Sequence, residues 1–128
     1  MTQPQADRWF HGYAKAFDSF DAEAVSDNLY VPCTIVGRTY VVALNSRAEV
    51  VENFEGVNEN HRNLGYHRAE LEECVVTPTY AEEVVEARTT WAFWKKDGTL
   101  VYRFRMIYFL TNLDGVWKIA VAVNIDDG

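Results

Sequence analysis

Residues 81–111 read AEEVVEARTTWAFWKKDGTLVYRFRMIYFLT, and this stretch decides the class of fold. Two runs rich in Val, Thr, Trp, Tyr and Phe flank the dipeptide Asp97-Gly98. The runs are typical of β-strands, and the dipeptide is typical of a two-residue hairpin turn. Such a turn places Lys96 opposite Thr99. Every later pair follows from this first one, and Arg88 is therefore predicted to lie opposite Ile107.

This register sorts the side chains of the predicted hairpin onto two faces, because successive residues of a strand point to opposite sides. One face is almost wholly apolar and carries Val85, Ala87, Thr89, Trp91, Phe93, Leu100, Tyr102, Phe104, Met106 and Tyr108. The other face, called the mixed face below, carries Glu86, Arg88, Thr90, Ala92, Trp94, Val101, Arg103, Arg105, Ile107 and Phe109. In the last predicted strand, residues 116–125, strict alternation separates Ala122 and Asn124 from Trp117 and Ile119.

For the rest of the chain, the sequence pattern predicts mainly helices in the first half and strands in the second half. Residues Trp9, Phe10, Tyr13, Ala14 and Phe17 recur at helical spacing. A second, shorter helix begins after Asp21, includes Leu29 and ends before Pro32. A third begins at Ser46, forms a capping box with Glu49, continues toward His61 and stops at Gly65. The remaining strands are predicted at 33–36, 39–44, 66–77 and 116–125. Helices followed by an antiparallel meander predict an α+β fold.

Composition limits the possible functions. The 128 residues are 48% hydrophobic and carry a net charge of −7, so residues 1–128 are expected to form a single folded domain without affinity for nucleic acid or anionic membranes. The start of the chain lacks the pattern of a secretory signal, and no apolar run is long enough to span a membrane, which favours a cytoplasmic location. Cys33 and Cys74 are expected to be reduced thiols.

No catalytic or metal-binding motif of high specificity is present, so no cofactor and no metal are predicted. The histidines His11, His61 and His67 are expected at the surface or its boundary, because none has a carboxylate at a spacing that would position it. Tyr13 lies on the apolar face of its helix, which favours a core tyrosine with its hydroxyl at the rim.

Three arginines on the mixed face, Arg88, Arg103 and Arg105, allow two interpretations. On a solvated face they form ion pairs worth about 0–1 kcal/mol each. In a partly enclosed cavity their guanidinium groups bind the carboxylate or another anionic group of a ligand. The residue pattern alone favours the solvated face.

The order of these elements resembles the nuclear transport factor 2-like superfamily, whose cystatin-like cone fold also occurs in ketosteroid isomerases and polyketide cyclases. The resemblance runs from Trp9 to Ile125 and rests on four segments, YAKAF at 13–17, DAEAV at 21–25, SRAE at 46–49 and DGVWKIA at 114–120. It implies three N-terminal helices packed in the concave side of a strongly bent, mainly antiparallel sheet, giving a cone-shaped α+β barrel. In such proteins the concave side forms a pocket, and the convex side commonly pairs two subunits.

Within this resemblance, Tyr13 corresponds to the hydrogen-bonding tyrosine of the ketosteroid isomerases. The general-base aspartate of those enzymes falls at Gly37 or Arg38, and the acid of the oxyanion hole falls at Ile107. Both carboxyl groups are therefore missing, which argues against a steroid isomerase. Neither the His and Asp pair of dehydratases nor the Asp, Arg and Asp set of epoxide hydrolases is recognisable.

The same resemblance implies that the mixed face is concave. The implied ligand-binding residues are Tyr13, Arg88, Thr90, Trp94, Arg103, Arg105, Ile107 and Asn124, with Ala120 and Ala122 nearby. The apolar face then becomes the convex surface, and exposed apolar area of this size implies a homodimer through Trp91, Phe93, Tyr102, Phe104, Met106, Tyr108 and Trp117. A simpler allocation stays open, in which the apolar face packs on the helices and the mixed face is exposed to water.

These observations predict a small-molecule-binding protein whose pocket takes an apolar ligand with a carbonyl or anionic group. Tyr13 donates a hydrogen bond in this hypothesis, and the arginines supply positive charge. Whether the protein is an enzyme is left open, with Tyr13, Glu86 and His67 as candidate catalytic residues. The alternative is a non-catalytic dimerisation or protein-interaction module, in which side chains fill the interior and glutamates pair with the arginines.

Overall fold

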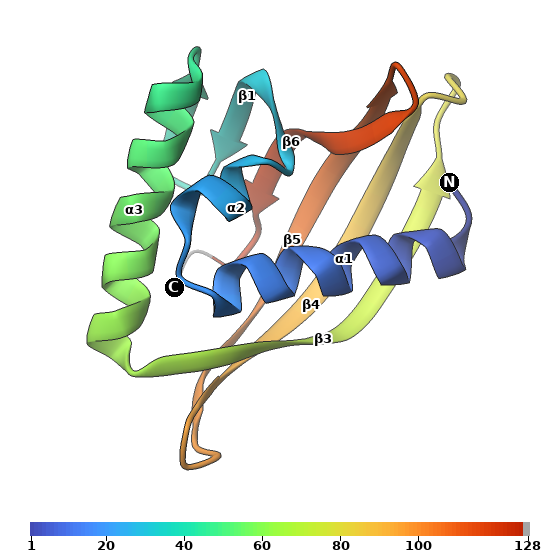
Figure 1. Ribbon diagram of the computed structural model, residues 1–128. Coiled ribbons are helices and arrows are strands. Elements are labelled where there is room, and N and C mark those ends of the chain that lie inside the picture. The colour runs from blue at the N-terminus through green and yellow to red at the C-terminus, as the bar shows by residue number, and fades with distance from the viewer. Residues whose placement is uncertain (127–128) are drawn as a thin grey trace.

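The structure is a computed structural model that describes residues 1–126. Three helices lie on one side of a strongly curved six-stranded sheet (Figure 1). The strand order is β2-β1-β6-β5-β4-β3. In chain order the elements are α1 (Gln3–Asp18), α2 (Ala22–Ser26), β1 (Leu29–Val36), β2 (Val41–Leu44), α3 (Arg47–Leu64), β3 (Tyr66–Pro78), β4 (Val84–Lys95), β5 (Leu100–Leu113) and β6 (Val116–Asn124). The predicted α+β class is confirmed.

The limits of α3 agree with the signals in the sequence. The hydroxyl of Ser46 accepts a hydrogen bond of 3.1 Å from the backbone N–H of Glu49, which satisfies one of the free donors of the first turn. At the other end, Gly65 has a φ of 80°, a left-handed conformation that glycine adopts without strain. These two caps set the length of α3 and hence its position along the sheet.

The second helix is shorter than predicted. It ends at Ser26, and β1 already begins at Leu29 and continues through Pro32. The reason is tertiary, because Leu29 pairs with Ile119 of β6 in a parallel arrangement, and the N–H of Ile119 donates to the carbonyl of Asn28 at 2.9 Å. Leu29, which has helical spacing in the sequence, is therefore part of the sheet, because it pairs with a strand about ninety residues later in the chain.

The predicted register of the β4–β5 hairpin is confirmed, although its turn differs. Arg88 lies opposite Ile107, and Phe93 lies opposite Tyr102. At the tip, however, the N–H of Lys95 donates to the carbonyl of Thr99 at 2.8 Å, so the loop holds three residues instead of two. A bulge between the Phe93 and Trp94 pairs compensates for the extra residue.

A second bulge changes the faces of β6. Phe109 pairs with Val121 whereas Leu110 pairs with Ile119, which leaves Ala120 as an extra residue. The inward direction therefore passes from Ile119 to Ala122 instead of continuing by strict alternation, and both residues are buried. The strict alternation predicted for this strand is wrong beyond Ala120.

The apolar face of the hairpin faces the helices. Trp91, Phe93 and Tyr108 are each at most 6% exposed, and Phe10 of α1 packs against Trp91 and Tyr108 with ring centroids 6.2 and 5.1 Å apart. The simpler of the two predictions, in which the apolar face packs on the helices and the mixed face is exposed to water, is thus the correct one. The homodimer interface implied for Trp91, Phe93, Tyr102, Phe104, Met106, Tyr108 and Trp117 is wrong, because these side chains belong to the interior of the protomer or pack against its core.

Two further features concern membranes and thiols. Within residues 1–126, no helix is long and apolar enough to cross a membrane.

Cys33 is buried and Cys74 is half-buried, and both are free thiols. Burial raises the pKa of each, so neither has the low pKa of a reactive cysteine.

Candidate functional site

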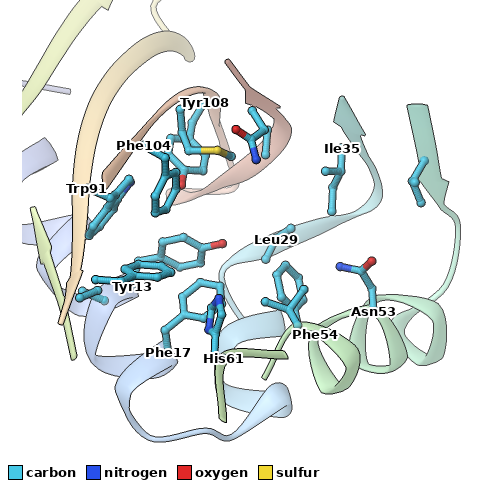
Figure 2. A pocket seen from close by; sticks show the side chains of 18 of the residues that line it. Tyr13, Phe17, Leu29, Ile35, Asn53, Phe54, His61, Trp91, Phe104 and Tyr108 are labelled. Carbon is cyan, nitrogen blue, oxygen red and sulfur yellow. The ribbon is translucent and has the colours of Figure 1, made fainter. Parts of the chain in front are cut away.

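A cavity of about 370 Å³ lies between the helices α1 and α3 and the concave face of the sheet. Figure 2 shows side chains from these elements converging on it. None of the described residues that line it is Asp, Glu, Lys or Arg. They are Tyr13, Ala14, Phe17, Leu29, Ile35, Tyr40, Val42, Asn53, Phe54, Val57, His61, Ala69, Trp91, Phe93, Tyr102, Phe104, Met106, Tyr108, Ala122 and Asn124.

Phe, Tyr and Trp rings form almost half of the described cavity wall. Tyr13 meets Phe17 and Tyr108 edge to face, with centroids 5.0 and 6.1 Å apart. From the sheet, Phe93 meets Phe104 edge to face at 4.9 Å. Rings held in this way present faces and edges that favour another flat ring as a neighbour.

Tyrosine hydroxyls supply hydrogen-bond donors to this wall. Burial raises the pKa of Tyr13 well above its ordinary value, with smaller contributions from Tyr108 and Cys33. Burial raises the pKa of Tyr102 and of Tyr108 as well. All three hydroxyls therefore stay protonated near neutral pH, and each can donate to an oxygen of a ligand.

His61 is a buried titratable group of the cavity wall. It is 5% exposed, its ring stacks on Tyr66 with a centroid distance of 4.8 Å, and it meets the edge of Phe93 at 5.0 Å. This burial lowers the pKa of His61 from 6.5 to about 4. The imidazole is therefore neutral near pH 7, and its Nδ1 has no hydrogen-bond partner among the residues that the structure describes.

The pKa of His61 predicts how the stability of the protein depends on pH. Because the folded pKa lies below the unfolded one, the unfolded chain binds the proton more tightly, and stability falls as the pH drops from about 6.5 to about 4. We expect a loss of about 2 kcal/mol in the free energy of unfolding. This is less than the free energy that corresponds to the whole pKa shift, because the ring borders a cavity. Urea unfolding at pH 7.5 and 4.5 measures this loss.

The matching control separates His61 from other groups. His61→Phe should remove most of the difference between the two pH values, whereas His11→Phe, at an exposed position of α1, should leave it unchanged. A His61→Phe protein that loses as much stability as the parent would contradict the assignment.

Two further polar atoms of the cavity wall are buried without a hydrogen-bond partner in the described part of the chain. They are Nε1 of Trp91 and Oδ1 of Asn124. Nε1 of Trp91 lies near the hydroxyl of Tyr108, whose pKa burial raises and Trp91 lowers by a smaller amount, but no hydrogen bond of acceptable geometry joins the two side chains. A buried polar atom without a partner costs about 1–3 kcal/mol, so such atoms mark places where a small rearrangement would gain a ligand contact.

Of the residues proposed from the sequence, Tyr13 and Asn124 line the cavity and the others do not. Asn124 faces inward, together with Ala122, because of the bulge at Ala120. Outside the cavity, on the outer face of the sheet or at its edge, lie Glu86, Arg88, Thr90, Trp94, Arg103, Arg105 and Ile107, and His67 is exposed on β3.

The predicted placement of the three arginines in the pocket is therefore corrected. The side chains of Arg88, Arg103 and Arg105 are 65%, 49% and 60% exposed, respectively. Arg103 donates to Glu72 at 3.0 Å and Arg105 donates to Asp126 at 2.8 Å, while Arg88 is paired with Glu86 on its own strand. These pairs agree with the interpretation in which the arginines lie on a solvated face. Ile107 is also on the outer face, so the position that holds the oxyanion-hole acid in ketosteroid isomerases does not reach the cavity here.

Sequence reasoning missed several residues of the cavity, above all Asn53, His61, Trp91, Tyr102 and Tyr108. The signal for His61 was its position at the end of the apolar stripe of the third helix. The signal for the other aromatic residues was their shared apolar face, which was assigned to the wrong side of the sheet.

The comparisons with known proteins agree with this architecture. Residues 3–127 match the model of a family described as NTF2-like protein (DUF6841). The chain belongs to this family. No curated protein matches the chain.

Solved structures of NTF2-like proteins share its fold. An NTF2-like protein with a cystatin-like fold from Novosphingobium aromaticivorans is 17% identical, with a TM-score of 0.73 over 94% of this chain and 80% of that one. The β subunit of a putative aromatic-ring-hydroxylating dioxygenase from the same organism is 13% identical, with a TM-score of 0.69 over 96% and 87%. A putative calcium/calmodulin-dependent protein kinase II association domain from Xanthomonas campestris is 14% identical, with a TM-score of 0.67 over 97% and 88%. These likenesses concern the fold alone.

Proposed function

We propose that this NTF2-like protein binds an uncharged, ring-containing small molecule that carries a carbonyl or hydroxyl group. The observation that carries the proposal is the aromatic cavity of about 370 Å³, whose wall contains hydrogen-bond donors and no charged side chain among the described residues. Burying an anionic group without a cation costs far more than burying a neutral polar group. Of the two ligand groups predicted from the sequence, the carbonyl is therefore favoured over the anion.

The polar groups of the cavity have distinct roles in this proposal. Tyr13 and Tyr108 donate their hydroxyl hydrogens to a carbonyl oxygen. The neutral imidazole of His61 either accepts a hydrogen bond from a hydroxyl group of the ligand or donates one to it. The aromatic walls hold the ring system by stacking and edge contacts. Binding is proposed without a reaction, because the described lining residues include no carboxylate and His61, with a pKa of about 4, is a weak base at neutral pH.

A pair of fluorescent probes tests the preference for an uncharged ring system. N-phenyl-1-naphthylamine is neutral, and 8-anilino-1-naphthalenesulfonate has the same rings with one added sulfonate. We expect saturable binding of the neutral probe, with quenching of Trp91, and at least about tenfold weaker binding of the sulfonate, since one unpaired charge costs more than the 1.4 kcal/mol that a factor of ten represents.

Variants place the probe in the cavity. Phe54→Ala should change the affinity or the emission wavelength of the bound neutral probe, because Phe54 lines the cavity from α3. Arg105→Leu on the outer face serves as the matched control and should change neither. Equal affinity for the two probes, or a larger effect of Arg105→Leu than of Phe54→Ala, would refute the proposal.

A second candidate function is association of two copies through the outer face of the sheet. There, Ile107 lies opposite Val123 and Phe109 lies opposite Val121, which forms a contiguous apolar group of four half-buried side chains. One structural relative is named an association domain. We infer that a second copy of the chain covers this group, with arginines and carboxylates around it forming a polar rim.

The mass in solution tests this second candidate. Light scattering after size exclusion should give twice the 14.7 kDa of the chain, and Val121→Glu should shift the mass to that of a monomer because a charge on the apolar group opposes its burial. Thr77→Glu, on the outer face of β3 and outside the group, is the control that keeps the dimer. A monomeric parent protein rules the dimer out without affecting the proposed cavity ligand.

A further inference from the structure

A second hollow lies on the other side of α3, between this helix and the start of α2. We call it the α2–α3 cleft, and it has a volume of about 380 Å³. The two helices lie side by side in Figure 1. The cleft is lined by Phe20, Asp21, Ala22, Glu23, Val51, Glu55, Asn58 and Arg62. Its lining residues are absent from the cavity described above, so the two hollows are separate.

The floor of the α2–α3 cleft holds an unsatisfied amide. Asn58 is 2% exposed, and within residues 1–126 neither its Nδ2 nor its Oδ1 has a hydrogen-bond partner. A buried carboxamide can donate two hydrogen bonds and accept two, and leaving all of them unmade is costly. A hydrophobic residue of similar size would be more favourable for packing alone, so a polar group that enters the cleft and bonds to Asn58 removes a cost that the protein otherwise carries.

The rim of the cleft carries opposite charges at its two ends. Glu55, Asn58 and Arg62 are spaced by three and four residues and therefore share one stripe of α3. Neither Glu55 nor Arg62 takes part in an ion pair among residues 1–126. At 1.5 Å per residue, their Cα atoms are about 10 Å apart along the helix. A carboxylate, an amide and a guanidinium thus follow one another along the cleft.

The guanidinium end is held in place by an aromatic ring. The guanidinium carbon of Arg62 lies 4.6 Å from the ring centre of Phe20, and Phe20 also packs edge to face on Tyr66 at 5.6 Å. A stacked guanidinium keeps its N–H groups free at the edge, where they can bind a carboxylate in a forked arrangement. Phe20 has a φ of 56°, a left-handed conformation that is strained for a bulky residue and is commonly retained at functional sites.

We propose that the α2–α3 cleft binds a dipeptide-like zwitterion along the stripe Glu55, Asn58 and Arg62. The ammonium group lies at Glu55 and the carboxylate at Arg62. In an extended chain, the N–H and the carboxyl oxygen of the second residue point the same way, so Asn58 Oδ1 accepts from this N–H while Nδ2 donates to the oxygen. An extended dipeptide spans roughly 7 Å at 3.3–3.6 Å per residue, and the flexible side chains of Glu55 and Arg62 cover the remainder.

Glycylglycine is the probe that tests this site. We expect saturable shifts in the ¹H–¹⁵N spectrum of the protein, including the side-chain NH₂ signals of Asn58. Glycinamide lacks the carboxylate and N-acetylglycine lacks the ammonium group, so each should bind at least about tenfold more weakly, the loss that corresponds to one charge-assisted hydrogen bond.

Variants assign the binding to the stripe. Arg62→Gln and Glu55→Gln, both at exposed positions, should each weaken glycylglycine binding at least about tenfold, whereas Glu59→Gln on the same helix should not. Asn58→Leu should abolish binding and raise the melting temperature of the ligand-free protein. Absence of saturable binding, an Asn58 amide bonded only to an ordered water, or full binding by Asn58→Leu would each overturn the proposal.

Discussion

Replacing Ala122 by Trp is expected to abolish binding of the neutral probe N-phenyl-1-naphthylamine, with a loss of affinity of about a hundredfold or more. Ala122 is 6% exposed and lines the cavity from β6, so an indole at this position occupies the space that a ligand needs. Fluorescence titration of the probe measures the loss. Far-UV circular dichroism shows whether the variant is folded, and the smaller Ala122→Leu replaces it if it is not.

The neighbouring residue provides the matched control for this substitution. Val121→Trp places the same side chain on the outer face and should leave the affinity for the neutral probe within about twofold, a difference well below 1 kcal/mol. The pair also tests the bulge at Ala120, because an unbroken alternation from Ile119 would turn Val121 inward and Ala122 outward. Loss of probe binding in Val121→Trp and not in Ala122→Trp would show that the register is wrong.

The largest expected effect on stability comes from Leu110→Ala. Leu110 is fully buried on the inner face of β5, opposite Ile119, which is also fully buried. Removing the side chain loses its transfer free energy and leaves a cavity, so the free energy of unfolding should fall by about 2–5 kcal/mol. Urea unfolding at neutral pH measures this difference.

Leu113→Ala is the matched control, because it makes the same chemical change three residues further along the same strand. Leu113 is 52% exposed, and its truncation should cost less than about 1 kcal/mol. Similar losses for the two variants would mean that the inner face of β5 does not hold the core.

The pairing of β4 with β5 was predictable because it depends on local signals. The apolar alternation and the turn around Asp97 and Gly98 place Arg88 opposite Ile107, and the structure has this pair. The limits of α3 were predictable for the same reason, since Ser46 and Gly65 act on the backbone within one turn. The family resemblance extended these local predictions to the whole architecture, and the match of residues 3–127 agrees with it.

The side of the sheet that forms the cavity was not predictable in this way. Alternation shows that Trp91 and Tyr108 share one face and that Arg88 and Arg105 share the other, but it is the same whichever face the helices cover. The helices cover the apolar face because burying its aromatic rings against α1 removes far more apolar surface from water than burying the mixed face would. Burying the mixed face would also strip the charged arginines of their hydration. The candidate site consequently consists of aromatic rings, aliphatic side chains, a methionine, neutral amides and a neutral histidine.

By itself, the sequence determined the order and approximate extent of most helices and strands, the caps of α3 and which side chains share a face of the hairpin. Each of these depends on contacts within a few residues or on the period of a strand. Only the tertiary structure decided which face is concave, that Leu29 joins β6, that the bulge at Ala120 turns Asn124 inward, and that His61 is buried and neutral. These features arise from packing between elements distant in the chain, where burial and desolvation are set by neighbours that no local pattern identifies.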